Sequence, residues 1–165
     1  MLATTGCRDQ ARKAVPSQEN PLEAAAQEAN LVVDPLTTPP TGLFERRHAA
    51  GLDAICMVPD EDDAYRFGMV VSFGTNLTCQ GGGTAVQDGE NLTLSFRDAE
   101  CTVKASYDGQ SIHIEGRVAE GCSALCGPRA SMSGVGVQRV GWNEADARLL
   151  EARVVQGRPT PRMCQ

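Results

Sequence analysis

Short stretches in which apolar and polar residues alternate dominate the second half of the chain. Residues 92–96, 103–107 and 112–115 carry an apolar side chain at every other position. Because side chains two residues apart in a strand point to the same face, this pattern predicts strands with one buried and one exposed face. The pairs Asp88-Gly89 and Asp108-Gly109 flank these stretches and favour tight hairpins, since glycine tolerates positive φ.

Further strands are expected on both sides of this region, at residues 43–47, 52–58, 65–73, 77–86 and 130–140. About eight short strands joined by turns are typical of an antiparallel meander. We therefore predict a mainly β fold, a small antiparallel β-barrel or sandwich of about eight strands with a C-terminal helix. The triplet Gly81-Gly82-Gly83 predicts a bulge or a barrel corner, because glycine interrupts regular pairing.

The C-terminal helix is expected to follow Trp142. Asn143 is a helix-capping residue, and Asp146 three positions later resembles the acidic end of a capping box. An apolar stripe at helical spacing follows, made of Ala145, Leu149, Leu150 and Val154. Gly157 and Pro159 would end the helix, which we expect to lie across the barrel or plug one end.

The N-terminal quarter of the chain has a different composition. Residues 8–41 are rich in Gln, Glu, Ala, Pro and Thr, which bury little apolar surface, so they predict a flexible tether. A short helix capped by Asn20, with Pro21 at its first position, is expected within it. The predicted domains are residues 1–7, 8–41 (tether) and 42–165 (disulfide-stapled β domain).

The charge balance excludes one class of partner. The chain of 165 residues has 21 acidic against 15 basic side chains, a formal net charge of −6. Nucleic-acid binding requires a basic face, so we expect no nucleic-acid partner. The sequence holds no apolar run of the length that a spanning helix needs, so membrane contact is expected only through a lipid anchor.

Seven cysteines are many for a chain of this length. An odd number leaves one residue over, and setting Cys7 aside leaves enough for three disulfides. We predict the pairs Cys56–Cys164, Cys79–Cys101 through a loop at one barrel end, and a local Cys122–Cys126. The alternative is a four-thiolate zinc site formed by Cys79, Cys101, Cys122 and Cys126.

The stretch Leu2-Ala3-Thr4-Thr5-Gly6-Cys7 resembles the end of a bacterial lipoprotein signal peptide. In that family small residues precede a cysteine that is acylated and becomes the new N-terminus. Thr4 stands where the family usually has leucine. The resemblance implies lipidation of Cys7, an upstream apolar signal segment, and a protein anchored to the outer membrane and facing the periplasm.

Catalytic and metal sites are not expected. The two histidines, His48 and His113, are interpreted as surface residues, because no motif places either beside a Ser or Cys nucleophile. The acidic run at residues 60–63 lacks the spaced ligands of a calcium loop and is interpreted as a solvated hairpin. We therefore predict no enzyme activity, no cofactor and no metal.

Two function classes remain open at this stage. The first is a cell-envelope interaction protein with an unknown protein partner, for example an inhibitor of a secreted hydrolase. Its expected binding loop is residues 121–129, in which an exposed Leu125 would enter a pocket and Arg129 would pair with a carboxylate. The second is a lipocalin-like carrier of a small apolar ligand, since Gly42-Leu43-Phe44 resembles the Gly-x-Trp of that family without its Trp. A purely structural envelope component is a third alternative.

Overall fold

The computed structural model describes residues 21–29, 33–74, 77–152 and 162–165. The chain divides into two compact units, of which the second begins at Val33. In the first unit, helix α1 (Pro21–Glu28) begins at the proline predicted for its first position. The expected cap Asn20 and the candidate lipidation site Cys7 lie outside the described residues. Among the residues that are described, no helix is long and apolar enough to cross a membrane.

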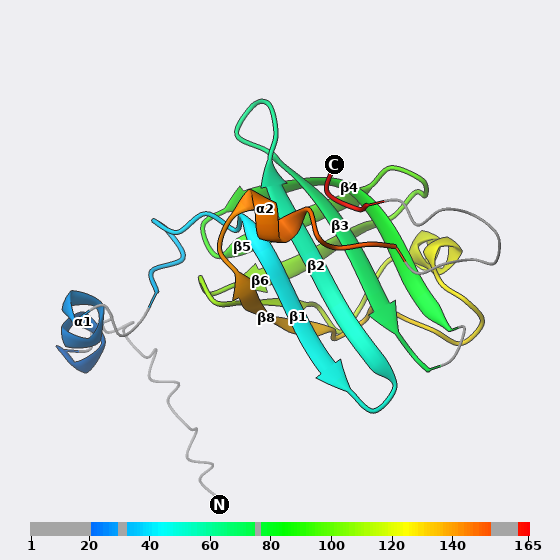
Figure 1. The fold of residues 1–165 in the computed structure, drawn as a ribbon, viewed down its shortest axis with the longest axis horizontal. Helices are drawn as coiled ribbons and strands as arrows, with labels where there is room; N and C mark the ends of the chain where they lie inside the picture. Colours follow the sequence, from blue (N-terminus) through cyan, green and yellow to red (C-terminus); the bar gives the residue numbers. More distant parts are fainter. Residues whose placement is uncertain (1–20, 30–32, 75–76, 153–161) are drawn as a thin grey trace, which may run out of the picture. The chain divides into compact units, whose positions relative to one another are not determined.

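The second unit is built around one closed antiparallel barrel, in which each strand pairs with its sequence neighbours (Figure 1). The last strand also pairs with the first, which closes the wall. The strands are β1 (Gly42–His48), β2 (Gly51–Pro59), β3 (Tyr65–Ser72), β4 (Thr78–Asp88), β5 (Asn91–Phe96), β6 (Thr102–Tyr107), β7 (Ser111–Ile114) and β8 (Gly136–Gly141). The predicted barrel is confirmed, and the sandwich alternative does not form.

The alternation read from the sequence decides which side chains enter the barrel. Along β5 and β6, exposed and buried residues follow one another without exception. Strand β8 differs from the prediction, because it begins at Gly136 and not at residue 130. Residues 130–135 belong to the long connection that precedes it, where Met132 and Val135 are buried among the interior side chains.

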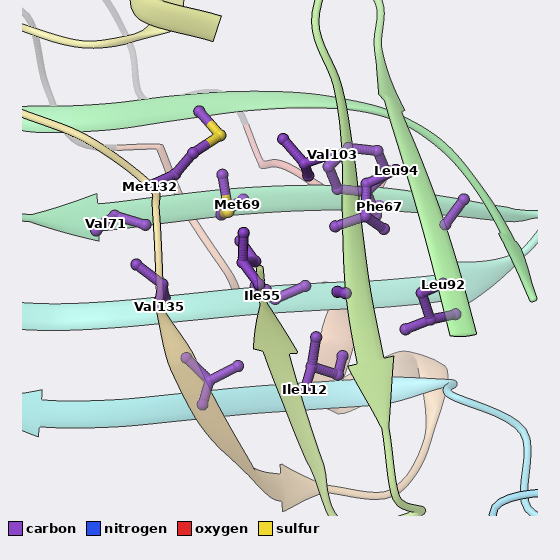
Figure 2. Close-up of a cluster of buried hydrophobic side chains, with 14 of the residues drawn as sticks. Ile55, Phe67, Met69, Val71, Leu92, Leu94, Val103, Ile112, Met132 and Val135 are labelled. Carbon is purple, nitrogen blue, oxygen red and sulfur yellow. The ribbon is translucent and has the colours of Figure 1, made fainter. Parts of the chain in front are cut away.

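The barrel interior is occupied by its own side chains, which come from every strand (Figure 2). Phe67 and Phe96 meet edge to face with their ring centroids 4.9 Å apart, a geometry that aromatic pairs favour. Each large apolar side chain buried here contributes about 1.5–3 kcal/mol through removal from water. The largest fully buried ones include Tyr107, Phe44, Phe67, Ile55, Met57, Met69, Leu92, Leu94, Ile112 and Met132.

A second apolar cluster lies outside the barrel, on β2 and its neighbours. Along β2 the side chains of both faces are buried from residue 53 to residue 58, so this strand is covered from outside as well as from inside. Figure 1 shows α2 (Glu144–Ala147) and the C-terminal residues lying across the outer side of the β1–β3 region. The outer cluster consists of Ala54, Cys56, Val58, Val70, Ala147, Leu150 and Cys164.

Helix α2 is much shorter than predicted. Asn143 is the N-cap, and its side chain accepts a hydrogen bond from the Asp146 backbone N–H, as expected. The helix nevertheless ends at Ala147, because packing on the outer cluster selects Ala147 and Leu150 and leaves Leu149 67% exposed. The expected stripe is therefore wrong at Ala145 and Leu149, which are exposed, and only its member Leu150 is buried as expected. Val154, Gly157 and Pro159 lie outside the described residues.

The glycine triplet forms no bulge. Gly81, Gly82 and Gly83 pair with β3 in unbroken register, and the register shift of the barrel falls instead between Leu43 and Phe44 on β1. The glycines allow neighbouring atoms to approach closely. A Cβ atom at Gly83 would lie 1.9 Å from the carbonyl oxygen of Ser95. A side chain here would therefore force the strands apart.

Residues 33–41 pack against one end of the barrel, ahead of the expected boundary at residue 42. The Arg139 guanidinium donates hydrogen bonds to the carbonyl oxygens of Pro39 and Thr41. The Tyr107 hydroxyl donates to the carbonyl oxygen of Thr38 at 3.0 Å. Arg139 also stacks over the Phe44 ring, 4.6 Å from its centroid. Burial lowers the pKa of Arg139, while the interaction with Tyr107 opposes that shift. These contacts close this end of the barrel.

Candidate functional site

The β7–β8 connection, residues 115–135, is the longest between strands and covers the other end of the barrel. In a meander, alternate connections lie at the same end, so this loop shares its end with the β3–β4 and β5–β6 connections. Cys79 begins β4 and Cys101 precedes β6 at that end, and Cys122 and Cys126 lie in the loop. The prediction that Cys79, Cys101 and Cys122 gather at one end is confirmed. We call this end the stapled end.

Two disulfides tie the β7–β8 loop to the barrel wall. Cys79 pairs with Cys126, and Cys101 pairs with Cys122. The third disulfide joins Cys56 to Cys164, as predicted. The predicted pairs Cys79–Cys101 and Cys122–Cys126 are wrong, and the four cysteines of the zinc alternative are all in disulfides.

The geometry of the loop explains these pairings. Cys79 and Cys101 lie on strands separated by β5, and next-but-one strands are about 9.6 Å apart, too far for a disulfide. Cys122 lies in a 3₁₀ helix, η1 (Glu120–Leu125), whereas Cys126 has already left it with extended backbone angles. Cys126 forms an isolated β-bridge with Cys79, which brings the two together. Cys122 is buried against the barrel instead.

The two residues expected to contact a partner are placed differently by the structure. Leu125 is partly buried and packs against the interior cluster, with its side chain beside Gly81 and close to Phe96. It therefore anchors the loop, and the expectation of an exposed Leu125 is wrong. Arg129 is exposed, at a positive φ of 64°. Ser123 and Ala124 of η1 are exposed as well.

A groove of about 220 Å³ runs along the loop surface. Its apolar lining comes from Val118, Ala119, Ala130 and Met132. The polar lining is small, consisting of Glu120, Ser123 and Ser131 beside the two loop cysteines. A groove of this kind, on a loop fixed at two points, is suited to hold one apolar side chain of a partner.

A buried carboxylate at the same end was not anticipated from the sequence. Asp53 is 1% exposed and accepts hydrogen bonds from the Arg46 guanidinium at 2.6 Å and from the Ser72 backbone N–H at 3.0 Å. His48 Nε2 lies 3.0 Å from Oδ1, the oxygen that also accepts from Ser72, whereas Arg46 binds Oδ2. Burial acts to raise the pKa of Asp53, but the hydrogen bonds from His48, Ser72 and Arg46 outweigh it and lower the pKa.

His48 is held in this cluster through both of its ring nitrogens. The Ala50 N–H donates to His48 Nδ1, so that the imidazole proton is on Nε2 and is donated to Asp53. Both ring nitrogens are therefore occupied, and neither is available to activate a nucleophile. His48 is exposed, as expected of a surface histidine, but its hydrogen bonds to Asp53 and Ala50 were not anticipated. The pairing of Arg46 with Asp53 in the β1–β2 hairpin was the signal that could have revealed the cluster.

The remaining sequence candidates lie apart from one another. His113 is exposed on the outer face of β7. The acidic run forms the β2–β3 hairpin, where Asp60 pairs with Arg66 at 3.0 Å. Within the part of the chain that is described, no three His, Cys, Asp or Glu side chains are grouped as a metal site would require.

Comparisons of the chain with protein-family models, with curated proteins and with solved structures gave no match.

Proposed function

We propose that this chain is a non-enzymatic interaction protein of the bacterial cell envelope that binds a protein partner through the β7–β8 loop. The observation that carries the proposal is the attachment of this one loop to strand β4 and to the β5–β6 connection by two disulfides. A loop held in one conformation before binding loses little entropy when a partner docks. Inhibition of a secreted hydrolase is the form of binding that such a loop suits best.

The number of disulfides supports a location outside the cytoplasm. Structural disulfides persist in oxidising compartments, of which the periplasm is one. Three pairs use six of the seven cysteines, leaving Cys7 over, beside the residues that resemble a lipoprotein signal. We place the protein on the outer membrane, facing the periplasm and held only by a lipid on Cys7.

Acylation of Cys7 is the first expected result. When the chain is expressed with an upstream signal segment, metabolic labelling with palmitate should label the wild-type protein. A Cys7→Ser variant should carry no label, because the thiol that accepts the lipid is gone. Label of equal intensity in Cys7→Ser would contradict the anchor.

The loop proposal predicts that substitutions in exposed residues of the β7–β8 loop weaken binding of the partner. Arg129→Glu and Ala124→Glu change exposed residues of the loop. The variant that carries both should reduce recovery of a partner from native envelopes at least about tenfold. The reason is that an unpaired charge buried in the interface costs several kcal/mol. Lys104→Glu makes the same charge change as Arg129→Glu, but on the exposed face of β6, and should leave recovery unchanged. Equal recovery with all variants would contradict the proposal.

A lipocalin-like carrier is the second candidate, and the closed barrel is the observation in its favour. The interior side chains argue for the first candidate, since they form one buried cluster that spans every strand. Displacement of a fluorescent fatty acid separates the two functions. Saturable binding at one site per chain would favour the carrier.

A further inference from the structure

A cleft of about 430 Å³ lies on the barrel wall where β1 meets β8. The paired residues of these strands end at Glu45 and Gln138, although β1 continues to His48 and β8 begins at Gly136. Beyond Glu45 the two strands are therefore no longer paired. The cleft occupies this unpaired part of the seam.

The lining of the cleft is rich in hydrogen-bond donors. Arg46, Arg47 and His113 face it, with Glu45 as the one carboxylate of the lining. Arg46 already binds Asp53 through Nε and Nη2. Arg47 has a side chain that is 79% exposed and a single contact at 3.3 Å with Glu45, an exposed ion pair of little strength.

The position of His113 depends on a glycine. His113 on β7 is paired with Gly136 on β8, and a Cβ atom at Gly136 would lie 2.4 Å from His113 Nδ1. The imidazole therefore lies over Gly136, and only glycine at that position leaves room for it. His113 lines the cleft together with the three β1 residues of the lining. Among charged groups outside the cleft, Asp108 interacts with His113 electrostatically.

We propose that this cleft binds a small oxyanion, the carboxylate or phosphate group of a soluble ligand. Guanidinium groups bind such oxygens with paired, charge-assisted hydrogen bonds, and an imidazole supplies an N–H donor in either protonation state. An anion in the opening also lowers the electrostatic repulsion between the two guanidinium groups. The site is separate from the β7–β8 groove, and its ligand is independent of the protein partner.

Titration of the full chain with inorganic phosphate, and separately with sodium acetate, tests this proposal at constant pH and ionic strength. The His113 ring and Arg47 side-chain resonances should shift and saturate with at least one of the two anions. Saturation with one anion alone would define the ligand class as phosphate or carboxylate. Arg47→Gln and His113→Gln should each weaken binding about tenfold, the effect of losing one charge-assisted hydrogen bond.

Arg117→Gln serves as the matched control, since Arg117 is exposed but does not line the cleft. Its affinity should equal that of the wild type. Weakening by Arg117→Gln to the same extent would show non-specific attraction and overturn the proposal. Shifts that fail to saturate with both anions would overturn it as well.

Discussion

Replacing Cys56 and Cys164 together with Ala should lower the free energy of unfolding by about 4 kcal/mol. The pair is separated by 108 residues, but the Cys79–Cys126 link shortens the path between them, which reduces the entropy that the bond removes from the unfolded chain. The bond also holds the C-terminal residues on the outer cluster, where Met163 lies against Gly68. Denaturant unfolding of both proteins under non-reducing conditions measures the difference.

The pair Cys101→Ala and Cys122→Ala is the matched control for this experiment. Its disulfide closes a shorter loop, with a separation of 21 residues, so a loss of about 3 kcal/mol is expected. Hydrogen exchange should then separate the two variants. Loss of the first bond should expose the outer side of β2 and β3, and loss of the second should loosen the β7–β8 loop. A loss below about 1 kcal/mol for the Cys56 pair would contradict the anchoring role.

The Asp53→Ala variant should lose about 1–3 kcal/mol of stability, the cost of leaving the buried Ser72 N–H without an acceptor, because the half-exposed Arg46 side chain can be solvated instead. Without the carboxylate, the Arg46 guanidinium, the His48 N–H and the Ser72 N–H lose their acceptor inside the protein. Asp60→Ala is the matched control, because Asp60 pairs with Arg66 in an exposed hairpin. That exposed pair should contribute little to stability, because water screens it. Similar losses in the two variants would contradict the role of the Asp53 cluster.

The same cluster predicts how stability depends on pH. The pKa of Asp53 is lower in the folded protein than in the unfolded chain, so its contribution is fully present above the unfolded pKa. It is lost as the pH falls through the folded pKa, since the carboxylate then takes up a proton. The free energy of unfolding should therefore decrease with acidification below about pH 4 in the wild type. Asp53→Ala should show a smaller decrease over the same range.

The strands could be predicted from the sequence because period-two alternation is a local signal. In β5 and β6, one face is buried and the other exposed, so the pattern and the structure coincide. Strand β2 carries buried residues on both faces, and its outer cover comes from α2 and the C-terminal residues. The alternation of apolar and polar residues along the sequence could not show that the outer face of β2 is covered. This cover depends on contacts between segments about 100 residues apart.

The candidate site was predicted only in part, because disulfide pairing depends on distances in three dimensions. The spacing of Cys122 and Cys126 favoured a local bond. In the structure, Cys122 lies in η1 and pairs with Cys101, whereas the β-bridge between Cys126 and Cys79 brings those two together. The sequence also could not show that Leu125 is partly buried. Its burial depends on Gly81, which leaves room for the Leu125 side chain on the barrel. Arg129 alone kept the exposed place that the sequence indicated.

Site-specific photo-crosslinking in native cells tests the central proposal most directly. A photoreactive amino acid replaces Ala124 in the loop, and in a second strain it replaces Glu90 in the β4–β5 turn at the opposite end of the barrel. The proposal predicts a discrete adduct with one envelope protein from position 124 and none from position 90. An adduct from position 90 alone, or the same adducts from both positions, would contradict binding through the β7–β8 loop.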